Sequence, residues 1–370
     1  MFDQQQQKIY QAAIWLIPGI GDILTKQLIA YCGSVEGVFK ANLKKLIQVP
    51  GIGEKTAREI LSRNSFAAAE KLLQACEKAR VTLVHYADPE YPSRFRHILD
   101  SPALLFINGN ADLENGKTVA IVGTRKATLY GKRIVEEIIA GLSAHKALIV
   151  SGLAYGIDIH AHKTALQHNM STVGVIAGGI NRLYPSSHAD TARKMLERGG
   201  IIAEYPPDTM PEAHHFPERN RIIAGLADLT IVVETGSPGG AMITAEYANN
   251  YNREVFAVPG NIHVVNSEGC NKLIRNHKAH IYTSFHDIEY IMNWDILKPK
   301  PKNQDAAFEG LSDSEKNIMQ VFRNNNNELL IDELSWKSNI PLNQLAGHLL
   351  NLELRGLVKS LPGKKFRLSV

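Results

Sequence analysis

The sequence has few cysteines and no long apolar run. Its 370 residues include three cysteines, Cys32, Cys76 and Cys270, and no two of them form a CxxC pair. Three scattered thiols argue against a disulfide framework and against a cysteine-based zinc site. No apolar run approaches the roughly 18 residues of a membrane helix, and the first residues, MFDQQQQKIY, do not match a signal peptide. These absences predict a cytoplasmic protein with no membrane contact.

The sequence also lacks a strong charge imbalance and the common catalytic motifs. Its 41 Lys and Arg against 37 Asp and Glu give a net charge of +4, which does not by itself indicate a nucleic-acid partner. No Walker A, HExxH or GxSxG pattern occurs. His160 and His162 diverge on a predicted helix, and the pair His214-His215 has no obvious partner ligand. We therefore expect no enzyme, no metal site and no cofactor.

The chain length predicts two or three domains, and four zones can be distinguished. Residues 1–75 are predicted to form short helices, and residues 76–292 alternate strand and helix patterns. Residues 293–310 form a linker rich in proline and lysine. Residues 311–370 contain three helical segments and a strand pair around a Pro-Gly turn, which is the layout of a winged helix. Its expected recognition helix offers one basic side chain, Arg355, so contact with protein and weak contact with DNA remain equally open.

The first zone contains a near-repeat. The segments IPGIGDILTKQLI, from Ile17, and VPGIGEKTAREIL, from Val49, place the same hairpin before an amphipathic helix. This is the helix-hairpin-helix pattern, whose backbone N–H groups can hold a phosphate. However, Asp22 and Glu54 follow the glycines directly and would repel a phosphate. The hairpins are therefore interpreted either as DNA contacts or as connectors within a small helical bundle.

The second zone predicts a Rossmann-like, doubly wound and mostly parallel sheet. Near-continuous apolar strands alternate with helical segments, a pattern typical of a parallel sheet covered on both faces. The six predicted strands are TVAIVG, ALIVSG, TVGVIAGG, GIIAEY, LTIVVET and EVFAVPG. The segment before them, DPEYPSRFRHILDSPALLFINGN, is interpreted as irregular. In such sheets ligands bind at the carboxyl ends of the strands, so the candidate site lies there.

The turn after the first of these strands reads VAIVGTRKATLYGKR. A dinucleotide-binding turn would have the pattern GxGxxG, but this turn has the single glycine Gly123 followed by Thr124, Arg125 and Lys126. One glycine and several cations suit successive phosphates of a nucleic-acid strand better than one compact pyrophosphate.

The segment FPERNR is the second part of the candidate site. We expect a helix to begin at Arg219, so that Arg219 and Arg221 lie at its N-terminus, where the helix dipole disfavours cations. Such a placement indicates either a phosphate clamp or struts to Glu218 or Glu234. The aromatic side chains available for stacking on bases are Phe216, Tyr184 and Tyr130, and a cationic groove with aromatic faces is typical of single-strand binding.

One stretch resembles an enzyme. In SPGGAMITAEY, a Pro-Gly-Gly followed by Thr244 and Glu246 is similar to the signature of lysine-decarboxylase-like phosphoribohydrolases. The match is partial, because Ile243 replaces the glycine that precedes the threonine.

Taken together, the motifs resemble the DNA-processing protein A (DprA, or Smf) family. The resemblance covers the alternating zone in order, through AIVGTRKATLYG, VSGLAYGIDIHAH, GGINRLYP, HHFPERNRIIAGLADLTIVVET, GAMITAEYA, VFAVPG and GCNKLI. It implies a homodimer that binds single-stranded DNA and loads the RecA recombinase during natural transformation. It also implies the DNA-binding residues Gly123, Thr124, Arg125, Lys126, Phe216, Arg219, Asn220 and Arg221.

The sequence departs from the family pattern at two loops. In the loop Gly239–Ala245, Gly239 and Ala241 stand where family members usually carry serine hydroxyls, and the stretch Glu212–His215 lacks a lysine. Three hypotheses follow from the sequence: a single-strand-binding recombination mediator, a nucleotide phosphoribohydrolase, and a duplex-DNA-binding protein that uses its terminal domains.

Overall fold

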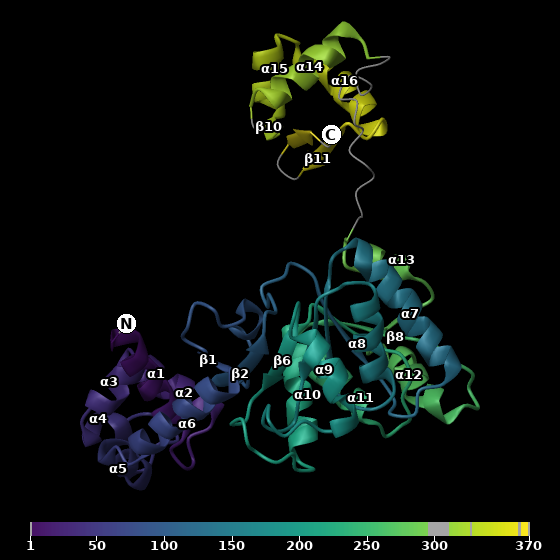
Figure 1. Cartoon of the computed structure of the whole chain (residues 1–370). Helices are drawn as coiled ribbons and strands as arrows, with labels where there is room; N and C mark the ends of the chain where they lie inside the picture. Colours follow the sequence, from purple (N-terminus) through teal and green to yellow (C-terminus); the bar gives the residue numbers. More distant parts are fainter. Residues whose placement is uncertain (1, 295–310, 326–327, 362–363, 369–370) are drawn as a thin grey trace. The chain divides into compact units, whose positions relative to one another are not determined.

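The computed structural model describes residues 2–294, 311–325, 328–361 and 364–368. The chain divides into two compact units, Met1–Trp294 and Asp295–Val370, shown in Figure 1. Each unit is described by itself. Among the described residues, no helix combines the length and the apolar character that crossing a membrane would need.

The first unit begins with a small helical bundle. Both hairpins of the near-repeat form as predicted from the glycines, since Gly19 (φ +82°) and Gly51 (φ +86°) adopt the left-handed conformation that favours glycine. Ile20 and Ile52 are buried between the helices. The helices are α1 (Phe2–Trp15), α2 (Asp22–Cys32), α3 (Val35–Lys40), α4 (Leu43–Ile47), α5 (Glu54–Ser62) and α6 (Ser65–Ala79).

A nine-stranded sheet follows, in the order β1-β2-β6-β5-β4-β3-β7-β8-β9. The strands from β6 to β9 pair in parallel, whereas β1 and β2 are antiparallel additions at the β6 edge. The strands are β1 (Thr82–His85), β2 (Leu104–Gly109), β3 (Thr118–Val122), β4 (Leu148–Gly152), β5 (Thr172–Val175), β6 (Gly200–Ala203), β7 (Leu229–Val232), β8 (Glu254–Ala257) and β9 (His280–Ile281). The predicted doubly wound, mostly parallel sheet is confirmed. The segment interpreted as irregular contains β2 and the short 3₁₀ helix η1 (Ser93–Phe95).

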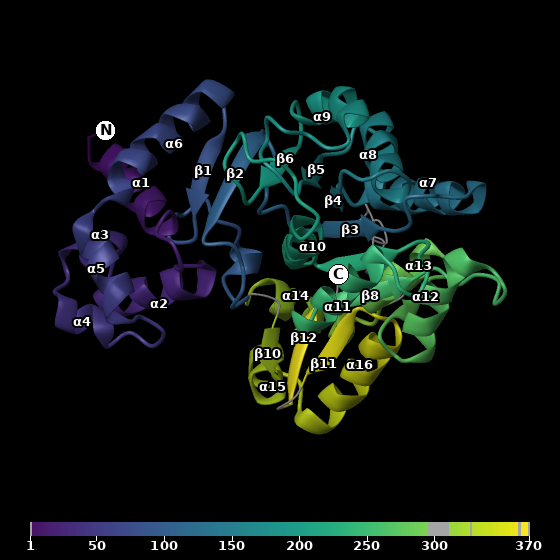
Figure 2. The ribbon, with the colours of Figure 1, turned by 90° about the horizontal axis from the view of Figure 1, so that it is seen from below.

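Helices cover both faces of this sheet (Figure 2). Along β3, Val119 and Ile121 face one hydrophobic cluster, while Ala120 and Val122 face another, as alternation along a strand requires. The first cluster includes residues of α7 (Leu129–Ala144), α8 (Ile157–Gln167) and α13 (Phe285–Ile291); the second includes residues of α10 (His215–Leu226), α11 (Gly240–Asn250) and α12 (Val265–Arg275). The helix α9 (Ala189–Met195) shares a third cluster with the N-terminal helices.

The start of α10 differs from the prediction. The helix begins at His215, one turn earlier than expected, so Arg219 and Arg221 lie inside the helix and not at its N-terminus. Residues two apart on a helix are separated by about 200° around its axis. The two arginines therefore project from opposite sides of α10.

The second unit has the winged-helix layout that the sequence predicted, together with one additional strand. Its helices pack around a small apolar core that includes Phe322 and Leu345. The third strand, β10, pairs with β12, which also pairs with β11. The elements are α14 (Asp313–Arg323), β10 (Glu328–Leu330), α15 (Ile331–Ser338), α16 (Leu342–Leu354), β11 (Val358–Leu361) and β12 (Lys365–Leu368).

Candidate nucleic-acid interface

A groove of about 890 Å³ lies at the carboxyl edge of the parallel sheet. Its walls are formed by the segments that follow β3, β4, β5, β6 and β7, and we call it the edge groove. Seven of the eight predicted site residues line it: Gly123, Thr124, Arg125, Lys126, Phe216, Arg219 and Asn220. Arg221 does not.

The turn after β3 is held in place by contacts with Ile157 and Glu234. A side chain at Gly123 would collide with Ile157, because an added Cβ would lie 2.6 Å from its Cγ1. The N–H of Thr124 donates to the carbonyl of Glu234 at 2.6 Å. The Glu234 carboxylate accepts from the hydroxyl of Thr128 at 2.6 Å and from its N–H at 3.0 Å. Glu234 therefore anchors this turn to the end of β7, rather than pairing with an arginine of α10.

The exposed rim of the edge groove carries cations and aromatic rings. The guanidinium carbon of Arg125 lies 5.7 Å from the centre of the Phe216 ring. The ring of Tyr184 meets Phe216 edge-on, with centres 6.0 Å apart and an interplanar angle of 74°. Arg125 and Lys126 are exposed, and neither has an ion-pair partner among the residues that the structure describes. Tyr130 lies outside the groove lining, and its hydroxyl donates to the carbonyl of Pro259 at 3.0 Å.

Arg219 lies in the floor of the same groove. Its side chain is buried, and its Nη1 donates to the carbonyl of Val175 at the end of β5. Its Nε donates to the Asn220 amide oxygen at 3.3 Å, and the Asn220 amide nitrogen donates to the carbonyl of Gly240 at 3.3 Å. Arg219 thus brings a positive charge beneath the groove while tying β5 to α10 and α11.

Asp158 is a groove residue that sequence reasoning missed. It is in the first turn of α8 and lines the edge groove. Burial raises the pKa of Asp158 to about 6, against the opposing charge of Arg219 and a hydrogen bond from the N–H of Ala154. Gly152 lies between the two side chains, and an added Cβ there would be 2.4 Å from Asp158 Oδ2 and 2.7 Å from Arg219 Nη1. The sequence signal was an acid two residues after Gly156, which precedes α8 in the glycine-containing turn after β4.

The start of α11 forms another wall of the edge groove. Gly239 is the N-cap of this helix, and no side chain caps its N-terminus. Gly239, Gly240 and Ala241 all line the groove. The missing hydroxyl groups thus leave a helix N-terminus whose backbone N–H groups and dipole favour an anion.

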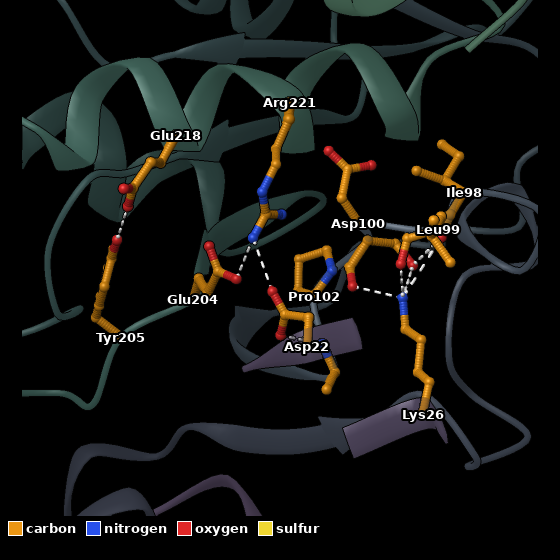
Figure 3. A network of polar contacts seen from close by, with 12 residues as sticks. Asp22, Lys26, Ile98, Leu99, Asp100, Pro102, Glu204, Tyr205, Glu218 and Arg221 are labelled. Carbon is orange, nitrogen blue, oxygen red and sulfur yellow. Dashed lines mark hydrogen bonds and ion pairs between the residues drawn. The ribbon is translucent and has the colours of Figure 1, made fainter. Parts of the chain in front are cut away.

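Arg221 forms a different contact, shown in Figure 3. Its Nη2 donates to Glu204 Oε1 and, at 3.0 Å, to Asp22 Oδ2. All three side chains are largely buried. Burial raises the pKa of Glu204, while Arg221 acts in the opposite direction. Asp22 Oδ1 also accepts from the N–H of Ala103 at 2.7 Å, so the acid that follows the first hairpin joins the N-terminal bundle to the core.

Lys26 strengthens the same junction. Its ammonium group donates to the carbonyl of Ser101 at 2.6 Å and to that of Leu99 at 3.0 Å (Figure 3). Burial lowers the pKa of Lys26 to about 8, although the nearby Asp22 raises it. Asp22 and Lys26, in the first turn and a half of α2, therefore face the core, and this face of α2 is not open to a ligand.

Three further groups could be considered as metal ligands. Glu212, His214 and His215 place one ligand atom each within 4.8 Å of one another, so the histidine pair does have a neighbouring carboxylate. However, Nδ1 of His215 is 3.1 Å from the carbonyl of Ala177, and its ring stacks on Tyr205 at 4.0 Å. Glu212 and His214 extend into solvent, so the three side chains do not form an enclosed cage.

Comparison with known proteins identifies the family. A family model described as DNA recombination-mediator protein A matches residues 82–293, which is more than half of the chain. A SAM-like helix-hairpin-helix tandem matches residues 16–63, and a DprA winged helix domain matches residues 303–364. The chain belongs to the DprA family.

Relatives support this assignment across most of the length. A putative DNA processing protein DprA of Mycobacterium tuberculosis is 33% identical over 327 residues, covering 85% of this chain and 84% of the relative. The Smf protein of Synechocystis is 29% identical over an alignment that covers 96% of this chain and 98% of that protein. The X-ray structure of DprA from Streptococcus pneumoniae superposes with a TM-score of 0.67 at 33% identity, covering 77% of this chain and 96% of that one.

A further DprA structure, from Helicobacter pylori, superposes with a TM-score of 0.53 at 27% identity and covers 58% of this chain and 97% of that one. Its description concerns a single-stranded DNA binding mode of that protein.

Proposed function

We propose that this protein binds single-stranded DNA in the edge groove and acts as a recombination mediator. The observation that carries the proposal is the rim: the Arg125 guanidinium lies over the half-buried ring of Phe216, with the exposed Tyr184 as a second ring. Cations track a phosphate backbone, and aromatic faces stack on unpaired bases. A duplex offers no free base faces to these rings.

The groove offers several contacts to a strand. Arg125 and Lys126 supply positive charge at the rim, and the uncapped start of α11 supplies backbone N–H donors. Arg219 adds positive charge below. The single-strand binding described for the Helicobacter pylori relative supports assigning the same ligand class to this chain.

The family resemblance extends the proposal to the loading of RecA recombinase during natural transformation by a cytoplasmic homodimer. These finer elements rest on the resemblance alone. They are tested by asking whether the purified protein speeds RecA filament assembly on single strands and whether it sediments as a dimer.

The phosphoribohydrolase hypothesis is disfavoured by the position of Glu246. Its carboxylate pairs with Lys278 at 2.7 Å in an exposed position, and it does not line the edge groove. The residue that resembles a catalytic acid therefore lies outside the edge groove. Release of free base from a nucleoside monophosphate, abolished in Glu246→Gln, would restore that hypothesis.

The proposed function is tested by comparing single-stranded and duplex oligonucleotides of the same length in an anisotropy titration. We expect tighter binding of the single strand. Each phosphate neutralised contributes about −0.7 to the slope of log K against log salt, so Arg125→Ala should flatten that slope by about 0.7 for several unrelated sequences. Tyr31→Ala, an exposed aromatic residue on α2, is a control. Preference for duplex, or an unchanged salt slope in folded Arg125→Ala, would contradict the proposal.

A further inference from the structure

A second hollow, separate from the edge groove, lies between α6 and the two segments that follow β5 and β6. Its volume is about 480 Å³, and we call it the α6 cleft. It is lined by Lys71, Gln74, Ala75, Lys78, Ala79, Asn181 and Asp208. The sequence motifs assign it no role.

The cleft contains two lysines on one face of a helix. Lys71 and Lys78 are seven residues apart on α6, a spacing that places them one above the other. The opposite face of α6 is fixed by burial of Ala69, Leu72 and Cys76. Both lysines are exposed, and neither has an ion-pair partner among the described residues. Their charge is therefore available to an anionic ligand.

The opposite wall of the cleft is rigidly held. The N–H of Asn181 donates to the carbonyl of Pro207 at 2.8 Å, and the N–H of Gly179 donates to that of Thr209 at 2.8 Å. A Cβ at Gly179 would lie 2.1 Å from the carbonyl oxygen of Pro206, so glycine permits the close approach of the two segments. Asn181 also donates from its side-chain amide to Asp208 Oδ1 at 3.1 Å.

This wall leads directly to the edge groove. Tyr184 lines the edge groove, and Asn181 lines the α6 cleft. Three residues of chain span at most about 11 Å, so the two hollows are separated by a short distance along the wall. Between them lies Arg182, which is exposed and has no ion pair among the residues described. Arg182 thus places a further exposed cation on the chain segment between the edge groove and the α6 cleft.

We propose that the α6 cleft binds the phosphates of the DNA strand as it leaves the edge groove past Tyr184. This inference rests on the proposed function and extends it to the N-terminal domain. The cleft offers lysines and no exposed aromatic ring, so it contacts the backbone and not the bases. One carboxylate, Asp208, faces the same space; it is outweighed by the two lysines and is engaged by Asn181.

The test uses the full-length protein and oligothymidylates of about 6 and about 20 nucleotides, the longer of which exceeds the largest site size of an OB fold, about 16 nucleotides. Affinity is measured by anisotropy over a series of salt concentrations. We expect the long strand to bind more tightly and with a steeper salt slope than the short one. In Lys71→Ala/Lys78→Ala, the short strand should bind as in the wild type, whereas the long strand should lose about 1.4 of its slope, or about 0.7 for each phosphate.

A control is Lys163→Ala/Lys194→Ala, which removes two exposed lysines of α8 and α9 that line neither hollow; of these, Lys194 pairs with Asp190 at 3.4 Å. It should leave both strands unaffected. An unchanged long-strand slope in the folded cleft variant would overturn the inference while leaving the edge groove intact. An equal loss for both strand lengths would also overturn it, because the lysines would then act on the edge groove. If the wild type binds neither strand, both proposals fail.

Discussion

The guanidinium of Arg221 donates a hydrogen bond to the carboxylate of Asp22 across 3.0 Å and 199 positions of sequence. Asp22 is the first residue after the first PGIG hairpin, and Arg221 is in the middle of α10. The corresponding acid of the second hairpin, Glu54, instead pairs with Arg58 on its own helix at 2.5 Å. The two near-identical motifs therefore have different contacts: the first fastens the bundle to the core, and the second remains exposed.

Removing Arg221 tests this relationship. Arg221→Ala leaves Glu204 and Asp22 buried without their cation, and the loss of one partner of a buried ion pair costs about 3–5 kcal/mol. We expect a correspondingly lower free energy of unfolding in urea, with an unchanged salt slope of single-strand binding in the folded protein. Glu204→Gln in the same background should recover part of the stability. Wild-type stability together with a flatter salt slope would show that Arg221 binds phosphate instead.

Phe216→Ala tests stacking in the edge groove. Loss of one base–aromatic contact should weaken single-strand binding by about 1–3 kcal/mol. The salt slope should change little, because no phosphate contact is removed. Phe216→Tyr, which keeps an aromatic face, is the matched variant and should bind nearly as the wild type does. Full affinity in a folded Phe216→Ala protein would rule out stacking on this ring.

The variant Asp158→Asn tests how the buried carboxyl group in the groove floor makes stability depend on pH. Burial in the folded protein raises the pKa of Asp158 from 3.8 to about 6. The folded protein therefore binds the proton of the Asp158 carboxyl group more tightly than the unfolded chain does. The contribution of Asp158 to stability is therefore present below about pH 4 and is lost as the pH rises to about 6. The free energy of unfolding of Asp158→Asn, relative to wild type, should increase by at most about 3 kcal/mol between pH 4 and pH 7. A difference that stays constant with pH would contradict this prediction.

Two truncations test where the first unit ends. Trp294 is buried, with its ring 5.1 Å from the Lys117 ammonium and 5.8 Å from the His145 ring. Truncation after Lys302 keeps this contact and should leave stability and short-strand affinity of the first unit largely intact. Truncation after Asn293 removes the indole and should cost about 3 kcal/mol or more. Loss of most short-strand affinity in the longer, folded fragment would favour the hypothesis that the terminal domain binds DNA.

Much of the fold follows from local sequence pattern. The six central strands alternate with helical segments, so both the parallel sheet and its ligand-binding edge were predictable. The strand β2, which lies between β1 and β6, was not recognised, because its apolar residues follow a stretch rich in proline and charge. The helix α10 begins one turn before the predicted start at Arg219, because His215 makes tertiary contacts that the local sequence pattern does not reveal.

The candidate site was predictable only in part. The glycine at position 123 and the cations beside it identify the turn after β3. By contrast, Arg221 is engaged by Asp22 and Glu204, which lie on elements distant in the sequence. Sequence spacing does not predict these ion pairs. The role of Asp158 was not predicted for the same reason, because the side chain of Arg219 that lies near it belongs to another helix, α10.

The strand order also determines when the edge groove can form during synthesis. The central strand β3 is bordered by β4, the next strand in the chain, and by β7, which is made about a hundred residues later. The turn after β3 is anchored by Glu234, and the opposite wall is completed by Thr244. A chain emerging from the ribosome therefore exposes Arg125 and Phe216 without a finished groove until the start of α11 has left the exit tunnel.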